Sequence, residues 1–219
     1  MRREINILDS HPKIVRDYDK RAKDRTPEVV CVAKRFGKDF FDGDRKYGYG
    51  GFKYDGRWKS VVKRMKEFYG LRDNASILDI GCAKGFMLRD FMDLMPECTI
   101  AGIDVSEYAI ENSMPAITPF LRVASAEKLP YPDKSFDLVV SVNSIHNLPL
   151  ERLKTALREI QRVCRGDSYI TVDAWRNEVE RENLFKWVLT AETMMHVDGW
   201  KKLFSNVGYT GDYWWFIAD

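Results

Sequence analysis

The chain has 219 residues, of which 45% are hydrophobic and 31% are charged, a composition typical of a globular protein. This length suits one α/β domain with an elaboration, and a core of this size can fold without disulfides or a structural metal. The net charge of only +2 argues against indiscriminate nucleic-acid binding by the whole molecule.

Positive charge is concentrated near the N-terminus. Residues 1–70 hold 19 Lys and Arg against 11 Asp and Glu, whereas residues 71–219 hold 16 and 22. A basic front end on an acidic body indicates either an anionic partner for the first 70 residues or a solvated basic helix.

The four cysteines, Cys31, Cys82, Cys98 and Cys164, form no CxxC pair, and with three histidines they predict no metal site. Such spacing indicates reduced thiols in a cytosol. The first ten residues lack the apolar run of a signal peptide, and no stretch approaches the ~18 apolar residues of a membrane span. We therefore expect a cytoplasmic protein that makes no contact with a membrane.

Residues 1–70 are expected to form a cap that precedes a core domain of residues 71–219. A charged helix is predicted over 15–25, and Thr26-Pro27 interrupts it. Residues 36–58 are rich in Gly, Tyr and Phe without a helical period, which indicates a structured loop. A short amphipathic helix is predicted over 59–70, ending at Gly70.

From residue 71 onward, apolar runs alternate with helical stretches, which is the pattern of a parallel sheet with crossover helices. The predicted strands are 77–80, 99–103, 120–124, 136–142 and 169–172, and the predicted helices are 84–95, 106–114, 149–164, 178–195 and 199–206. The fold class is therefore α/β, a Rossmann-like and mostly parallel sheet with helices on both faces and an N-terminal cap.

An aromatic strand is expected at the C-terminal end, over residues 212–218. Its sequence Tyr213-Trp214-Trp215-Phe216 places rings on both faces of the strand. Such rings indicate either core packing or a dimer contact, so a homodimer is an open alternative.

The strongest motif is a buried strand that runs through Asp79 into the small-residue turn Gly81-Cys82-Ala83-Lys84-Gly85, after which a helix follows. Small residues let the backbone approach a ligand closely, and a helix N-terminus attracts a carboxylate or phosphate. Asp79 lies at the strand end, where α/β sheets bind ligands. A dinucleotide site is the alternative, but its GxGxxG pattern requires a glycine where Phe86 stands.

Asp104-Val105-Ser106 follows the second strand. Asp104 lies 23 residues after Gly81, close to the usual ~20 for an acid that accepts both ribose hydroxyls. The alternative is a helix cap, and Ser106 can cap while Asp104 binds.

Two polar segments follow the next two strands. After the third strand comes the turn Ser125-Ala126-Glu127, whose groups can meet an adenine edge. The fourth strand is followed by Asn143 and then by His146-Asn147.

In this order and spacing, DIGCAKGF, GIDVS, SAEKLPYPDKSFDLVV and LREIQRVCRGD resemble the class I S-adenosylmethionine (SAM)-dependent methyltransferases. Within that class they look most like small-molecule enzymes with a ubiquinone/menaquinone-methyltransferase-like core. The resemblance covers residues 71–175 well and the termini poorly. It implies SAM as the cofactor and methyl transfer as the reaction. Ala83 replaces the middle glycine of the family's turn, a departure that bears on how tightly this turn can close.

The resemblance also assigns roles to residues of this sequence. Asp79, Gly81 and Gly85 would contact the methionine end of SAM, and Asp104 would hold the ribose. Asn143 would line the pocket under the sulfonium. The further cofactor candidates are the neighbours of these residues and the adenine turn: Cys82, Ala83, Val105, Ser125, Ala126 and Glu127.

Methyl transfer is an in-line displacement, so the protein must mainly align the nucleophile with the methyl group, about 3–3.5 Å away, and exclude water. A base is needed only if the nucleophile arrives protonated. His146 is the candidate base, because an imidazole titrates near neutrality. The alternative is that His146 and Asn147, the latter a candidate acceptor ligand, merely cap the next loop.

Tyr18 is a further candidate for the catalytic machinery. Residues 15–22 resemble the N-terminal Tyr-Asp-x-x-Ala helix of many relatives, so Tyr18 either closes over the methionine end or is an ordinary helix tyrosine.

The loop of residues 45–52 is the unusual element of the sequence. Tyr47 and Tyr49 offer hydroxyls and rigid faces, the glycines let the loop fold over a ligand, and Arg45 and Lys46 can receive a phosphate or carboxylate. The alternative is an aromatic loop packed on the core.

The sequence favours O- or N-methylation of a small acceptor that carries a phosphate, a carboxylate or a sugar, in surface-polysaccharide or natural-product biosynthesis. Residues 46–58 and 208–216 look like segments of methyltransferases encoded beside bacterial surface-polysaccharide genes. An RNA or protein methyltransferase is the alternative, but no Asn/Asp-Pro-Pro-Tyr-type motif or separate RNA-binding module is visible. A catalytically silent SAM-binding partner subunit is the third hypothesis.

Overall fold

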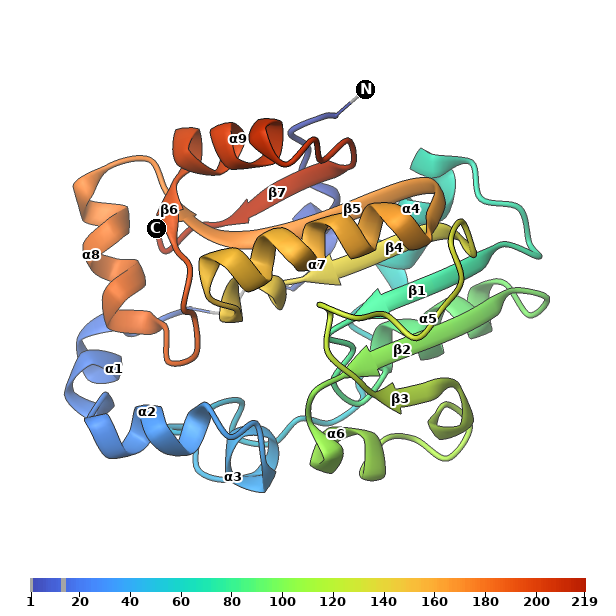
Figure 1. The fold of residues 1–219 in the computed structure, drawn as a ribbon. Coiled ribbons are helices and arrows are strands. Elements are labelled where there is room, and N and C mark those ends of the chain that lie inside the picture. Colours follow the sequence, from blue (N-terminus) through green and yellow to red (C-terminus); the bar gives the residue numbers. More distant parts are fainter. Residues whose placement is uncertain (1, 13–14) are drawn as a thin grey trace.

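The computed structural model describes residues 2–12 and 15–219, which fold around one central sheet (Figure 1). The strand order is β3-β2-β1-β4-β5-β6, and β7 also pairs with β5. All pairings among these strands are parallel, so their carboxyl ends lie at one edge. The strands are β1 (Ser76–Ile80), β2 (Thr99–Asp104), β3 (Leu121–Val123), β4 (Phe136–Val142), β5 (Cys164–Trp175), β6 (Met195–His196) and β7 (Asp212–Phe216).

Helices cover both faces of the sheet, which confirms the predicted Rossmann-like architecture. Helices α4 (Lys59–Tyr69) and α5 (Phe86–Leu94) contribute to the hydrophobic cluster on one face, and α7 (Leu150–Val163) and α9 (Val197–Asn206) contribute to the cluster on the other. The remaining helices are α1 (Tyr18–Asp24), α2 (Pro27–Ala33), α3 (Lys38–Asp42), α6 (Glu107–Glu111) and α8 (Glu178–Trp187). Within the described ranges, no helix is both long and apolar enough to traverse a lipid bilayer.

Several elements differ from the sequence-based expectation. Helix α2 and strand β6 were not expected, and the helix predicted over 106–114 ends at Glu111. The predicted loop 36–58 contains α3, because Phe41 is buried and holds one turn of helix against its aromatic neighbours. The helix predicted over 178–195 ends at Trp187, since Val188 is extended and the amides of Glu192 and Thr193 bond to the carbonyl of His146. Strand β5 begins at Cys164, directly after α7, with a register shift against β4 near residues 136–138.

The first residues of the chain pack on the sheet rather than on the cap. The backbone of Glu4 forms a bridge with Tyr213, and Ile7 is fully buried in the same cluster as α4. Residues 1–70 therefore do not all pack as one cap. We propose that only residues 17–58, which include α1, α2 and α3, form the cap beside the sheet (Figure 1).

The C-terminal aromatic strand belongs to the core. The Phe204 ring is fully buried and stacks on Trp215 at 6.3 Å between centroids, and it meets Tyr213 at 5.0 Å. Of the two alternatives for these rings, core packing is the one that the intramolecular contacts support.

Candidate active site

The turn after β1 is tied to the end of β2. The amides of Gly81 and Cys82 both donate to the carbonyl of Ile103, at 2.8 and 2.9 Å. Gly81 and Gly85 have φ of 76° and 74°, and a Cβ at Gly85 would lie 2.7 Å from Ile117 Cγ2. The glycines are therefore required by both conformation and space. Ala83, which stands where the family has its middle glycine, adopts the left-handed conformation with φ of 50°.

Asp104 lies at the carboxyl end of β2 and holds this turn from the other side. Its Oδ2 accepts the amide of Ala83 and its Oδ1 accepts the amide of Ser106, each at 2.8 Å. A carboxylate oxygen has two acceptor sites, so both oxygens can still receive ribose hydroxyls. Ser106 also caps α6 by accepting the amide of Ala109 at 3.0 Å. The sequence motif thus serves helix capping while leaving the acid able to bind.

Two buried carboxylates meet at this edge without a balancing cation. Asp79 and Asp104 are only 4% and 9% exposed. Burial and the charge of Asp104 raise the pKa of Asp79 to about 8. Burial also raises the pKa of Asp104, against the amides of Ser106 and Ala83. Among the described residues, no lysine or arginine forms an ion pair with either acid. A cationic ligand would therefore be stabilised here.

The residues predicted to lie beside adenine follow β2 and β3. Val105 is 53% exposed directly after Asp104, an apolar surface that suits a flat ring. Ser125 donates to Glu127 Oε2 at 2.9 Å, and Glu127 also forms an ion pair with Arg152. The carboxylate of Glu127 is therefore already bonded within the protein. A contact between this turn and adenine stays a prediction, and it would be made mainly by the backbone of the turn.

Asn143 follows β4 in a left-handed conformation with φ of 49°. Its amide donates to Thr171 Oγ1 at 2.9 Å, and its side-chain oxygen accepts the Thr171 hydroxyl at 2.8 Å. These bonds fix Asn143 against β5 at the carboxyl end of the sheet. Its place under a sulfonium stays a prediction.

His146 is buried beside the end of β5. Its Nδ1 accepts the amide of Asp173 at 3.2 Å, and its Nε2 lies 3.4 Å from Asp173 Oδ2. Burial lowers the pKa of His146, against the charge of Asp173, so the neutral imidazole is favoured. The base role stays a prediction, and in this geometry it would require Nδ1 to release the Asp173 amide. The arrangement itself positions the end of β5.

The cap is joined to the cofactor turn through one carboxylate. Asp42 Oδ2 receives Lys84 Nζ at 2.6 Å and the Tyr108 hydroxyl at 2.8 Å, and Oδ1 receives the amide of Phe52 at 3.0 Å. The Phe52 ring stacks on Phe86, the first residue of α5, at 4.8 Å between centroids. These contacts hold the cap loop directly over the start of α5.

Tyr49 is the exposed aromatic residue of the cap loop, at 47% exposure. Burial of its hydroxyl raises the pKa to about 12, with a further contribution from the carboxylate of Asp104. The Tyr49 ring packs on Phe52 at 4.4 Å and on Phe41 at 5.8 Å. Part of the loop is therefore packed on the core, and Tyr49 is its accessible part.

The other predicted acceptor residues lie in different surroundings. Tyr47 packs against the small hydrophobic cluster of Val29, Ala33 and Leu189, and the ammonium of Lys46 lies over the Tyr47 ring. Asn147 Oδ1 is buried without a hydrogen-bond partner among the described residues. An unpaired buried acceptor costs about 1–3 kcal/mol, so a donor from a ligand would be favoured at Asn147.

Tyr18 lies in the packing between α1 and α8. Its hydroxyl donates to the carbonyl of Asp219 at 3.0 Å, and its ring meets Trp187 edge-on at 5.9 Å. These contacts describe Tyr18 as a packing residue between α1 and α8. Its closure over the methionine end of SAM stays a prediction.

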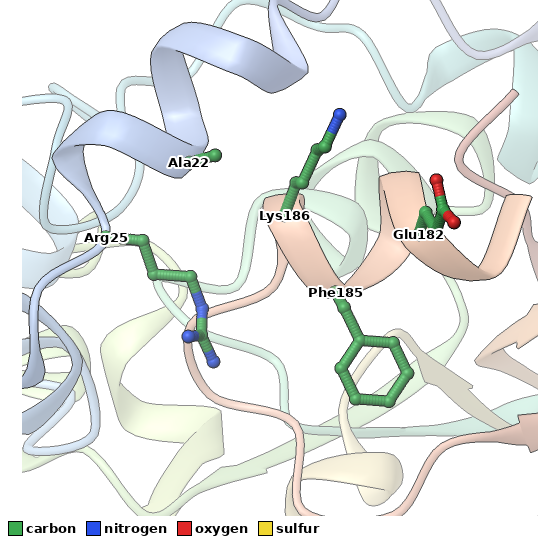
Figure 2. A pocket seen from close by; sticks show the side chains of 5 residues that line it. All are labelled: Ala22, Arg25, Glu182, Phe185 and Lys186. Carbon is green, nitrogen blue, oxygen red and sulfur yellow. The ribbon is translucent and has the colours of Figure 1, made fainter. Parts of the chain in front are cut away.

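A groove of about 390 Å³ runs between α1 and α8 (Figure 2). Ala22 and Arg25 line it from the α1 side, and Glu182, Phe185 and Lys186 line it from α8. Its charges are mixed, and none of the predicted cofactor residues lines it.

A parallel sheet, a left-handed turn after β1 and an acid at the end of β2 define a Rossmann-like nucleotide-binding class of fold. Comparisons with known proteins narrow this class. Residues 78–172 match the model of a methyltransferase domain family. The chain is 30% identical over 146 residues to the tRNA (carboxymethyluridine(34)-5-O)-methyltransferase of Arabidopsis thaliana, covering 66% of this chain and 34% of that protein. It is 28% identical over 128 residues to the demethylmenaquinone methyltransferase of Symbiobacterium thermophilum, covering 54% and 50%.

Among solved structures, the YcgJ protein from Bacillus subtilis aligns with a TM-score of 0.53 at 20% identity, over 67% of this chain and 66% of that one. Residues 78–172 therefore carry a methyltransferase domain, and its fold and relatives support SAM as the cofactor. The chain spans half or less of the length of the two relatives named above.

Three groups at the site escaped sequence analysis. Asp42 had no signal of its own inside a loop rich in Asp and Gly. Trp187 reads as an ordinary residue of an amphipathic helix, and Arg16 and Arg21 read as part of a solvated basic helix. The excess of positive charge in residues 1–70 pointed to the two arginines only collectively, and nothing pointed to Asp42 or Trp187.

The buried acid pair predicts an unusual dependence of stability on pH. The folded-state pKa of Asp79, about 8, lies above the ordinary value of about 3.9. Between these values the folded protein holds a proton that the unfolded chain has released, so stability falls as pH rises. We expect Asp79→Asn to stabilise the ligand-free protein, by a margin that grows about 1.4 kcal/mol per pH unit across this window. Urea unfolding at pH 5 and pH 7.5 measures the effect.

Glu111→Gln is the matched control, because it removes an exposed carboxylate from α6. A pH dependence of stability that is the same in Asp79→Asn and in the wild type would contradict the buried-acid account. If Asp79 contacts SAM as predicted, the stabilised variant should also bind SAM more weakly, since it lacks the carboxylate that a cationic cofactor would keep ionised.

Proposed function

We propose that this protein transfers the methyl group of SAM to a small acceptor with a negatively charged group, on oxygen or nitrogen, beneath the cap of residues 17–58. The observation that carries the proposal is that Asp42 holds the cap loop, with the exposed Tyr49, at the turn after β1. One relative, the demethylmenaquinone methyltransferase, acts on a small molecule by name.

The cofactor would lie along the carboxyl ends of β1, β2 and β4. When bound, SAM supplies an electrophilic methyl group on a sulfonium. Asp79 and Asp104 are two buried acids without an ion-pair partner among the described residues, and a ligand with a sulfonium and an ammonium group would favour their ionised forms. The turn from Gly81 to Gly85 offers its backbone at close range, and Asp104 offers acceptor sites for ribose hydroxyls.

The acceptor would lie between the cap loop and the end of β4. Tyr49 would orient it and, with Phe52, exclude water from the reacting atoms. Asn147 would accept a hydrogen bond from it, because its buried Oδ1 has no partner among the described residues. Tyr47, Lys46 and His146 would act as supports of this wall, and Arg45 would meet the acceptor's negative group.

A polymer acceptor is the second candidate, favoured by two observations. A relative that is 30% identical is a tRNA methyltransferase by name, and residues 1–70 of this chain are basic. RNA held by such a surface would bind with a steep dependence on salt. We further propose that the protein acts in the cytoplasm on a diffusible substrate, alone or as a homodimer.

The function is tested by the mass of the product. The purified protein is incubated with SAM and pools of phosphorylated, carboxylated or sugar-linked metabolites, in parallel with tRNA and with unfolded protein. The proposal expects a methylated small molecule together with S-adenosylhomocysteine. Methylated RNA or protein would favour the second candidate, and bound SAM without turnover in any pool would indicate a silent partner subunit.

Tyr49→Phe is expected to lower kcat/KM for the acceptor about tenfold, because the hydroxyl that would orient the acceptor is lost. The affinity for SAM, measured by calorimetry, should remain near that of the wild type. Tyr47→Phe is the matched control in the same loop, because its ring packs in a hydrophobic cluster instead. Equal losses in the two variants, accompanied by lower melting temperatures, would contradict the assigned role of Tyr49.

A further inference from the structure

Three arginines gather around one indole between the cap and α8. The guanidinium carbons of Arg16, Arg21 and Arg45 each lie 5.4 Å from the ring centroid of Trp187. Arg16 precedes α1 and the cap, Arg21 lies on α1, and Arg45 comes from the cap loop, so three separate points of the chain converge on the last residue of α8. Such stacking favours each cation individually.

Within residues 2–12 and 15–219, none of these three guanidinium groups forms an ion pair with a carboxylate. Arg21 donates to the carbonyls of Trp187, Arg45 and Lys46, at 3.1, 3.1 and 2.9 Å. Arg45 donates to the carbonyl of Gly48. Elsewhere, arginines such as Arg162 and Arg176 are paired with acids.

The positive charge of the cluster is therefore not neutralised by an ion pair among the described residues, although the charge of Asp24 acts on Arg21. Burial lowers the pKa of Arg21 to about 10, and the charge of Arg45 acts in the same direction. Burial likewise lowers the pKa of Arg45, with a contribution from Arg16. In addition, Arg16 Nε is buried without an acceptor among the described residues. A bound anion would relieve the mutual repulsion and would satisfy the buried donor.

The cluster lies close to the carboxyl end of the sheet. The guanidinium carbon of Arg16 is 4.6 Å from the ring centroid of Phe216, the last residue of β7. Arg45 precedes Tyr49 in the cap loop, and its charge opposes the rise in the pKa of the Tyr49 hydroxyl. Burial raises the pKa of Asp173 near the end of β5, and the charges of His146 and Arg16 oppose it. The arginines therefore lie near both the cap loop and the end of β5.

We propose that Arg16, Arg21 and Arg45 form an anion site beside Trp187 that holds a phosphoryl group of the acceptor. This assignment of the ligand to the acceptor rests on the proposed function, whereas the anion site itself does not. A phosphoryl monoester carries about −1.5 to −2 charges and three acceptor oxygens, which matches three guanidinium groups better than the single charge of a carboxylate. Guanidinium groups also bind phosphate oxygens in a bidentate manner.

The competing explanation is that the arginines only clamp α1 to α8. Arg25 supplies a matched control for that role. Its Nε donates to the carbonyl of Val188 at 3.0 Å, just as Arg21 Nε donates to the carbonyl of Trp187 at 3.1 Å. Arg25, however, lines the separate groove between α1 and α8 (Figure 2). Removing either arginine loses one clamp, but only Arg21 belongs to the cluster around Trp187.

Inorganic phosphate is the probe, titrated by calorimetry at constant ionic strength, with acetate as the monoanionic comparison. We expect phosphate to bind the wild type more tightly than acetate does. Arg16→Gln and Arg21→Gln should each weaken phosphate binding about 10- to 100-fold, because a charge-assisted contact is lost. Arg45→Gln, which changes an exposed residue, should weaken it in the same way, and Arg25→Gln should leave it unchanged. SAM affinity is measured in the same samples.

The proposal is overturned if phosphate binds no more tightly than acetate, or if Arg16→Gln and Arg21→Gln bind it as the wild type does. It is also overturned if Arg25→Gln loses phosphate affinity to the same extent, since clamping then explains the result. Phosphate binding in a protein that does not bind SAM would support the anion site and contradict the proposed function. SAM binding without any phosphate binding would contradict the anion site and would leave the proposed function standing.

Discussion

The carboxylate of Asp42 is the junction on which the geometry of the site depends. It accepts hydrogen bonds from Lys84 in the cofactor turn, from Tyr108 in α6 and from the amide of Phe52 in the cap loop. Because Lys84 and Asp42 are both largely shielded from water, their attraction is screened less than that of a surface pair. The ion pair between Lys84 and Asp42 joins the cap to the turn. Because Lys84, the cation of the turn, is paired with Asp42, it forms no ion pair with Asp79 or Asp104, and these acids remain available to a cationic ligand.

The site therefore separates its charges. Two buried acids lie at the ends of β1 and β2, and three arginines without acidic partners lie around Trp187 on the cap side. Tyr49 is influenced by both groups, since Asp104 raises and Arg45 lowers the pKa of its hydroxyl. Such an arrangement suits a cationic cofactor on one side and an anionic acceptor on the other. Its cost is like-charge repulsion in the ligand-free protein, as expected where a protein sacrifices stability for a binding site.

Sequence reasoning predicted the core because its signals are local. The apolar strands, the glycine turn and Asp104 lie within short windows, and their spacing alone indicates a parallel sheet with a ligand edge. The cap was predicted only as basic and aromatic, because its contacts are distant in sequence. Asp42 meets a lysine 42 residues away and a tyrosine 66 residues away, and Arg21 meets the carbonyl of Trp187 at a separation of 166 residues. No periodicity encodes such pairings, and α3, one turn stabilised by the burial of Phe41, likewise lacks a local signal.

The central claim is that cap and core form one binding site, with the cofactor at the strand ends beneath the loop that carries Tyr49. Hydrogen–deuterium exchange with and without SAM measures this most directly. The account predicts slower exchange both at the amides of residues 81–85 and 104–106 and at those of residues 49–53, because a cofactor at the acid pair would rigidify the turn and, through Lys84 and Asp42, the cap loop. Protection confined to the core, with unchanged exchange in residues 49–53, would contradict it.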